Sequence, residues 1–234
     1  MDPISTRILL GTAGAGGLPE IGEFYEGGYF AGYISHTANG VATHGLIVAP
    51  KSAEVTRQFN PSGTGQSYTH SAYDGAANTA DLADGGHPAH DYCAGLTIGG
   101  YSDWYLPAYA ELEVAYGNLK PSSTANTTAT FGTEAPNGHG PIAFNGSNYT
   151  SPLRPNNNTS SNPPQTSVSI FQSGGAQCFE SNESNFGAIY LTSNQRFATY
   201  GGDIIALRFS DGRYRDQAGS TSYHYVRAFR RFAV

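Results

Sequence analysis

The chain has 234 residues, including 30 glycines and 16 tyrosines, and only 13% of its residues are charged. Its formal charge of −6 gives no general attraction to nucleic acid, and no apolar run approaches the roughly 18 residues of a membrane-spanning helix. We therefore expect no nucleic-acid partner and no membrane insertion. The composition favours short strands, tight turns and long loops over helices.

The first 22 residues have the composition of an N-terminal arm. Pro3, the Gly/Ala run at 11–17 and Pro19 offer little side-chain bulk to hold a core. The arm is either a disordered leader or a segment ordered by docking on something else. Its apolar stretch, Ile8–Leu10, is too short for a secretion signal. We expect a single domain over residues 23–234.

A β-hairpin is predicted at the start of this domain. The apolar runs 24–34 and 45–50 flank a turn-like segment that contains Asn39-Gly40. This dipeptide between two apolar runs is typical of a hairpin turn. Residues 24–34 and 45–50 are therefore expected to form two strands.

Two helices and one short turn are predicted next. Asp74 is placed to cap a helix over 75–83, and residues 88–94, which begin with a proline, are expected to form a second short turn. The second helix is expected to start at Pro107, with Leu112, Tyr116 and Leu119 on one apolar face, and to end at Lys120-Pro121.

The second half of the domain is loop-rich and then strand-rich. Residues 121–165 are dominated by Asn, Thr, Ser, Pro and Gly, which predicts a long surface insertion. Strands are predicted at 188–192, 203–209 and 223–232, with a tight turn at Asp211-Gly212. In the second of them, alternation places Ile205, Leu207 and Phe209 on one side and Ile204, Ala206 and Arg208 on the other.

Reactive constellations are weak in this sequence. His87 and His90, with Asp84 and Asp91 nearby, match no defined zinc spacing, so they are expected to be surface histidines near a helix start. Cys93 and Cys178 form either a single bridge or two buried free thiols, and the usual burial of unpaired cysteine favours the thiols. We predict no enzyme activity, no cofactor and no bound metal. The sequence contains no clear calcium-binding loop, and whether the chain binds calcium is left open.

The segment 100–112 contains a motif made of Gly100, Asp103, Trp104, Leu106, Pro107, Glu111 and Leu112. We expect Trp104 to lie in the core and Glu111 to be a local cap or ion-pair partner.

With this motif the segment resembles the Lcl C-terminal-like domain family, a variant of the C-type lectin fold. The resemblance implies an α+β fold with a twisted antiparallel sheet, two helices and long loops, and it identifies 225–231 as the final strand. Residues 189–195 depart from the family at Leu191, where tryptophan is usual.

A second resemblance covers residues 5–17, 21–24 and 46–52. These segments look like short tail-fibre or tail-tip proteins of bacteriophages. The resemblance implies a virion protein made in the host cytoplasm, whose arm attaches to other tail or baseplate proteins. Its lectin-like domain would bind a host-cell surface receptor, either a polysaccharide or an outer-membrane protein. Analogy with tail fibres favours a homo-oligomer, and among the oligomeric states it favours a trimer. The alternatives are a structural tail-tip or baseplate component and a surface-glycan hydrolase.

In lectin-fold proteins that vary their ligands, the late strands and their loops form the binding face, which here means 189–224. Tyrosine stacks on sugar faces, and arginine offers planar forks to anions. Arg227, Arg230 and Arg231 are instead expected to pair with acidic neighbours such as Glu23 or Glu26. The predicted receptor-binding residues are Tyr190, Thr192, Asn194, Arg196, Tyr200, Asp203, Arg208, Arg213, Tyr214, Arg215, Asp216, Tyr223 and His224.

Overall fold

The computed structural model describes residues 17–63, 71–126, 148–153, 159–181, 188–195, 203–219 and 221–234, without the side chains of 203 and 214–219. Within these ranges it contains the helices α1 (Gly75–Leu82), α2 (Pro88–Ala94) and α3 (Tyr109–Leu119) and the 3₁₀ turns η1 (Lys51–Ala53) and η2 (Ser169–Phe171). The strands are β1 (Phe24–Tyr25), β2 (Gly28–Ile34), β3 (His44–Val48), β4 (Val55–Arg57), β5 (Thr150–Ser151), β6 (Ile189–Gln195), β7 (Asp203–Arg208), β8 (Tyr214–Gly219), β9 (His224–Val226) and β10 (Phe229–Ala233).

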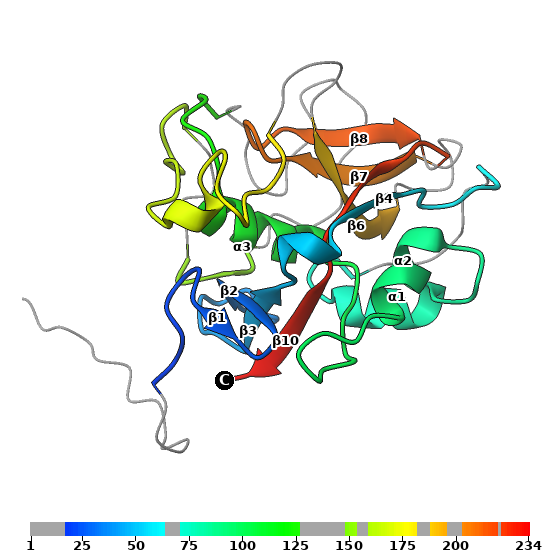
Figure 1. Cartoon of the computed structure of the whole chain (residues 1–234), viewed down its shortest axis with the longest axis horizontal. Helices are drawn as coiled ribbons and strands as arrows, with labels where there is room; N and C mark the ends of the chain where they lie inside the picture. The colour runs from blue at the N-terminus through cyan, green and yellow to red at the C-terminus, as the bar shows by residue number, and fades with distance from the viewer. Residues whose placement is uncertain are drawn as a thin grey trace, which may run out of the picture.

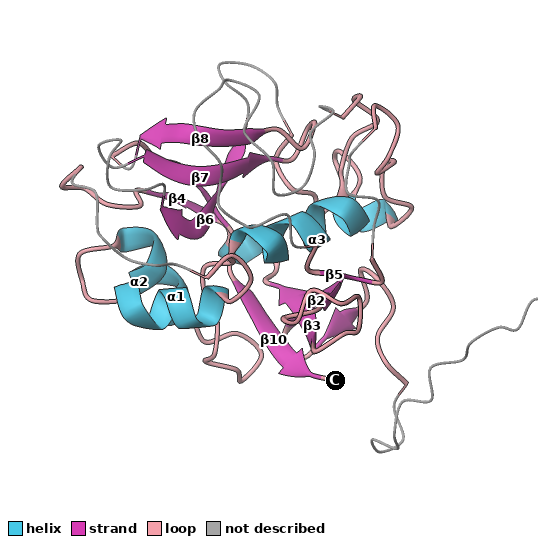
Figure 2. Cartoon of the chain, turned by 180° about the vertical axis from the view of Figure 1, so that it is seen from behind, coloured by secondary structure: helices cyan, strands magenta, loops and turns pink. Residues whose placement is uncertain are grey.

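The strands form two sheets with α3 between them (Figures 1 and 2). Sheet A has the order β1-β2-β3-β10, and β5 also pairs with β2. Sheet B has the order β4-β9-β6-β7-β8. Most neighbours are antiparallel, but β6 and β9 run parallel. The predicted α+β class is confirmed, with three described helices where the resemblance implied two.

The predicted hairpin is confirmed, and it contains one more turn than expected. Strands β2 and β3 pair antiparallel across the segment that holds Asn39-Gly40. The single strand expected over 24–34 is split into β1 and β2 because Glu26 and Gly27 both adopt a positive φ. Two consecutive residues with positive φ make the tight turn that suits a two-residue hairpin.

Both predicted helices are present, and the segment expected to form a short turn is a third helix, α2. Asp74 caps α1 by accepting a hydrogen bond from the Ala77 N–H at 2.9 Å, as predicted. Helix α2 begins at Pro88. Helix α3 begins at Tyr109, two residues later than expected. Its predicted apolar face is confirmed, and Leu112, Tyr116 and Leu119 are all buried.

The strand expected over 223–232 is broken, and its halves belong to different sheets. Strand β9 pairs with β6 and β4, whereas β10 pairs with β3. The break lies at Arg227, whose buried guanidinium donates to the carbonyls of Ala49 and Gln177, each at 2.8 Å. The same guanidinium lies 4.6 Å from the centre of the Phe179 ring. The prediction missed β8, although the expected turn at Asp211-Gly212 is present, with Gly212 at φ +69°.

The described end of the predicted arm touches the domain. Pro19 is buried, and the Gly22 N–H donates to the Phe30 carbonyl at 2.8 Å. The residues from Pro19 to Gly22 therefore pack on sheet A. Residues 1–16 lie outside the described ranges, so the rest of the arm remains a prediction.

The motif segment 100–112 lies in the core. Trp104 is 2% exposed, and its Nε1 donates to the Tyr101 carbonyl at 3.0 Å. Tyr105 forms an isolated bridge with Phe229, which fixes the segment to the start of β10. Asp103 forms an ion pair with Arg230 at 2.8 Å. The motif therefore connects α3 to the last strand of sheet A.

Glu111 caps α3, as expected. Its Oε2 accepts hydrogen bonds from the Ala108 N–H at 2.7 Å and from the Gly75 N–H at 3.1 Å. Its Oε1 lies 2.7 Å from the Tyr105 hydroxyl. Because the carboxyl group is completely buried, desolvation raises its pKa to about 8. One side chain thus joins the starts of α1 and α3 to the segment before them.

We predict that Glu111→Ala lowers the free energy of unfolding by about 2–5 kcal/mol, because it leaves two buried N–H groups without an acceptor. Glu111→Gln keeps a carbonyl acceptor and is expected to cost about 1 kcal/mol. Urea unfolding of both variants at pH 7 measures the difference. Equal losses for Ala and Gln would show that side-chain volume, not the hydrogen bonds, is what the site requires.

Candidate functional site

The central strands of sheet B are buried on both faces. Ile205 and Leu207 pack into one apolar core, and Ile204 and Ala206 pack into another on the opposite face. The predicted alternation along β7 is confirmed, but neither side of these four residues is exposed. At these four positions β7 therefore offers no exposed side chain to a partner.

Three of the predicted binding residues lie in this interior. Tyr190, Thr192 and Asn194 are at most 2% exposed. Tyr190 donates to Glu54 at 2.8 Å, and Thr192 donates to the Ile205 carbonyl at 2.7 Å. Their polar groups bond inside the fold, so the expectation that they contact a receptor is corrected.

Asn194 has a structural role that was not predicted from the sequence. Its Oδ1 accepts the Tyr109 N–H at 2.8 Å, so it bonds one of the free donors at the start of α3. Its Nδ2 donates to the Ser71 carbonyl at 2.9 Å. The neighbouring Ser193 accepts from Asn78 of α1 at 2.8 Å. These contacts attach the end of β6 to α1 and α3.

Several predicted residues lie on the β7–β8 hairpin, at one edge of sheet B. Tyr214, Arg215 and Asp216 belong to β8, the outer strand in the described order. The register of β7 and β8 shifts between Ile204 and Ala206, which marks a bulge beside these residues. Bulges are frequent at sheet edges and next to functional sites. Asp203 begins β7, and its backbone pairs with β8.

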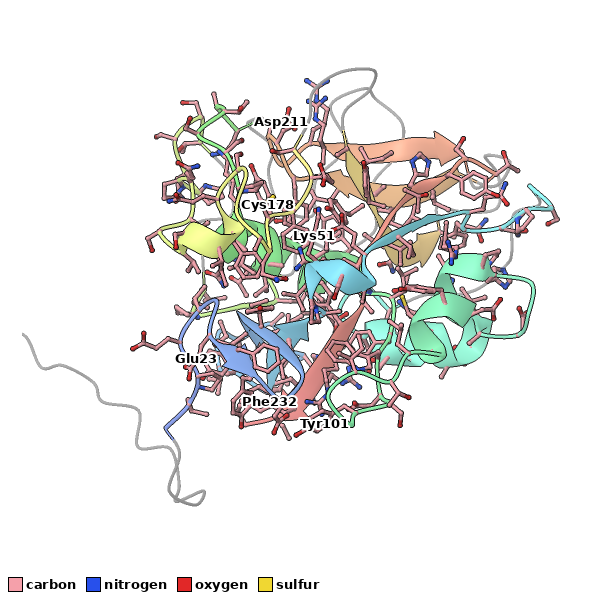
Figure 3. The ribbon with its side chains drawn as sticks, viewed as in Figure 1. Glu23, Lys51, Tyr101, Cys178, Asp211 and Phe232 are labelled. Carbon is pink, nitrogen blue, oxygen red and sulfur yellow. The ribbon has the colours of Figure 1, made fainter. Side chains whose placement is uncertain are left out.

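The turn of this hairpin is held by an ion pair. Arg208 binds both carboxylate oxygens of Asp211, with Nε at 2.7 Å from Oδ1 (Figure 3 labels Asp211). The Arg213 N–H also donates to Asp211, at 3.1 Å. Arg208 therefore stabilises the turn and is occupied by that contact. Arg213, half-buried, directly precedes β8.

The last two predicted residues lie at the other side of the sheet. Tyr223 is 66% exposed, and His224 begins β9. Strands β6 and β7 separate β9 from β8, so the two groups are about 14 Å apart at the usual strand spacing. The predicted residues thus form two separate rims, the β8 rim and the β4–β9 rim. Arg196 and Tyr200 lie outside the described residues.

Sequence reasoning missed an arginine on the second rim. Arg57 ends β4 and lies opposite His224 in the antiparallel register. Its guanidinium carbon is 4.9 Å from the centre of the Tyr92 ring of α2. The β-branched residues before it, in Val55-Thr56-Arg57, were a signal for a strand at this position.

The C-terminal arginines pair internally, as predicted, with partly different partners. Arg230 binds Glu26 at 2.6 Å, which confirms one named partner. Arg231 binds Asp74 at 2.7 Å, and Arg227 lies 3.8 Å from Glu54. Glu54 lies between η1 and β4, and Asp74 directly precedes α1. Both are far from the arginines in sequence, so these pairs were not predicted.

A polar cluster also joins η1 to the segment before β6 (Figure 3). Lys51 bonds both Glu54 and Glu180, each at 2.7 Å, and its N–H donates to Gln177 at 2.7 Å. Cys178 follows in the chain as a half-buried free thiol, and Cys93 is a buried free thiol. The favoured alternative of two unpaired cysteines is therefore confirmed, although only Cys93 is fully buried.

His87 and His90 are buried, so the expectation that they lie on the surface is wrong. His87 Nδ1 lies 2.9 Å from Asp84, and a ring of Phe59 packs edge-on against His90. Asp91 accepts the Gly85 N–H at 2.9 Å. In the described ranges, no three His, Cys, Asp or Glu side chains are grouped as a metal ion requires. No described helix has the length and apolar character to cross a membrane.

Four half-buried rings from separate segments lie against one another, at tilted angles, near the start of α1. His44 and His36 lie 4.3 Å apart, His36 and Tyr73 4.9 Å, and Tyr73 and Tyr149 4.6 Å between ring centres. Burial, the other histidine and Arg231 lower the pKa of His36 to about 4. Burial and Arg231 also lower the pKa of His44. Both rings are therefore neutral at pH 7.

Comparison with protein-family models, with curated proteins and with solved structures finds no match to this chain.

The His36 environment predicts a pH dependence of stability. Because the folded pKa is about 4 and the ordinary value is 6.5, the unfolded chain takes up a proton first as the pH falls. His36 therefore lowers stability progressively between about pH 6.5 and pH 4. Replacing it by phenylalanine keeps a ring and removes the titration. Urea unfolding from pH 7 to pH 4.5 should show a smaller loss for His36→Phe than for the wild type, whereas parallel curves would contradict the assignment.

Proposed function

We propose that this chain is a bacteriophage tail-fibre or tail-tip protein that binds a receptor on the host bacterial surface. In this proposal its domain is a variant of the C-type lectin fold, and the segment 100–112 is the motif of that fold. The roles of Trp104 in the core and Glu111 as a cap support this interpretation. The pairing of the final strand β10 with the early strand β3 also supports it.

The observation that carries the binding proposal is the position of β8. The inner strands of sheet B are fixed by two apolar cores and by buried hydrogen bonds from Thr192 and Asn194. Strand β8 is the outer strand of this rigid sheet and carries Tyr214 and Arg215. Tyrosine and arginine are enriched among the residues that dominate binding energy. A rigid support reduces the entropy lost when such residues bind.

The receptor-binding rim in this proposal is smaller than the sequence indicated. It consists of Arg213, Tyr214, Arg215 and Asp216 on the β7–β8 hairpin, with Asp203 at the start of β7. A structural tail-tip component remains the second interpretation, because a rim of this kind fits a virion partner as well as a receptor.

Alanine substitution of the rim tests the proposal. We expect Tyr214→Ala and Arg215→Ala each to weaken binding of the purified chain to susceptible bacteria by about tenfold or more, as for hot-spot residues. Phe24→Ala is the matched control, since Phe24 is an exposed aromatic residue on sheet A. Its binding should equal that of the wild type, measured with labelled protein on intact cells.

Two results would contradict the proposal. If the wild-type chain fails to bind susceptible cells but the rim variants fail to enter assembled particles, the chain is a structural component. If the wild type binds and the rim variants bind equally well, the site lies elsewhere.

A further inference from the structure

Arg57 and Arg213 are described arginines without an ion pair to an acidic side chain among the described residues, and of the two only Arg57 lies over an aromatic ring there. Arg208, Arg227, Arg230 and Arg231 each form an ion pair with an aspartate or glutamate. In the described part of the chain Arg57 has no such partner, and its one hydrogen bond is from Nη1 to the Thr56 carbonyl at 2.9 Å. Arginine has five N–H donors, so four of them have no hydrogen bond to a described residue.

The guanidinium of Arg57 is nevertheless held in place. It lies over the ring of Tyr92, at 4.9 Å from the ring centre, where the negative face of the ring attracts it. The Tyr92 hydroxyl donates to the Ala53 carbonyl at 2.8 Å, so the ring itself is anchored to the η1 turn. A charged fork that is stacked and oriented loses less entropy when it binds an anion.

The surroundings of Arg57 are polar and carry one large exposed ring. Thr56, Thr221 and Ser222 are exposed, and Gln58 donates to the Thr221 carbonyl at 2.6 Å, which ties the two segments together. Tyr223 follows in the same segment and is 66% exposed. Protein-binding surfaces usually have an apolar centre, which these residues lack. These residues suit a sugar ligand, because a tyrosine ring packs against the apolar face of a sugar and hydroxyl groups form hydrogen bonds with it.

We propose that the β4–β9 rim is a second binding subsite, specific for an acidic sugar unit of a surface polysaccharide. Arg57 binds the carboxylate or phosphate of the sugar through its free N–H pairs, and Tyr92 orients Arg57. Tyr223 supplies a ring for the sugar face. The subsite rests on the proposed receptor-binding function, and it adds the class of ligand. Arg57 and Tyr92 are not among the receptor-binding residues predicted from the sequence. The β4–β9 rim is therefore tested with its own variants, separately from the β8 rim.

The test is calorimetric titration of the purified full chain with matched ligands. The probes are a galacturonic acid tetrasaccharide, the same tetrasaccharide with its carboxyl groups reduced to alcohols, and mannose 6-phosphate. We expect the wild type to prefer at least one anionic probe over the neutral one by about tenfold or more, as for hydrogen bonds to a charged group. The preference should weaken as salt is raised.

Four variants separate the contributions of the Arg57 charge, the planar Arg57 fork and the Tyr92 ring. Arg57→Gln should abolish the preference for the anion, whereas Arg57→Lys should retain part of it, because lysine keeps the charge without the planar fork. Tyr92→Leu should weaken anionic binding by removing the stacking surface, and Tyr92→Phe should weaken it less. Thermal melting of each variant confirms that the chain is folded.

The outcomes separate the subsite from the proposed function. Equal binding of anionic and neutral probes by the wild type, or an undiminished anion preference in Arg57→Gln, would overturn the subsite. Failure of the wild type to bind any of the probes would also overturn it, while binding to susceptible cells decides independently whether the chain is a receptor-binding protein.

Discussion

The hydrogen bonds that converge on the buried carboxyl group of Glu111 are the contacts on which the rest of the structure depends. Ala108, Gly75 and Tyr105 come from the start of α3, the start of α1 and the segment bridged to β10. Asn194 adds a contact from β6 to the same helix end. Without these acceptors, backbone donors would be buried unpaired, which is costly in an apolar interior. The junction therefore fixes α3 between the two sheets.

This position of α3 determines where a partner is able to bind. Because the helices and sheet A cover the central strands of sheet B, the polar residues of β6 turn inward and bond within the fold. Tyr190 and Thr192 illustrate this, since each is buried and donates to an internal acceptor. The two proposed binding sites therefore lie at the rims of the sheet. One rim carries Tyr214 and Arg215, and the other carries Arg57.

The parts of the fold that depend on neighbours in the chain were predictable. The Asp74 cap, the Asn39-Gly40 hairpin and the apolar face of α3 follow from local patterns, and all three are present. Strand β8 was not predictable, because Tyr-Arg-Asp-Gln-Ala-Gly lacks an apolar alternation. Its pairing with β7 supplies the strand geometry. The break at Arg227 was also hidden, since it depends on carbonyls of Ala49 and Gln177, which are distant in sequence.

The candidate site was predictable only in part, for the same physical reason. The presence of a tyrosine, threonine or asparagine in the sequence does not tell whether the residue lies on a binding surface or bonds to a buried helix end. Asn194 shows the difference, because its partners Tyr109 and Ser71 come from other elements. Arg57 was missed because an arginine without an acidic partner is recognised only after the other arginines have been paired.

We propose that sheet B binds a bacterial surface polysaccharide at its rims and not on its face. Hydrogen–deuterium exchange of the chain with and without polysaccharide from a susceptible host tests it most directly. We expect slower exchange at 214–219 and at 56–58 with 221–224, and unchanged exchange in β2 and β3. Protection confined to sheet A, or no protection anywhere on a chain that binds the polysaccharide, would contradict it.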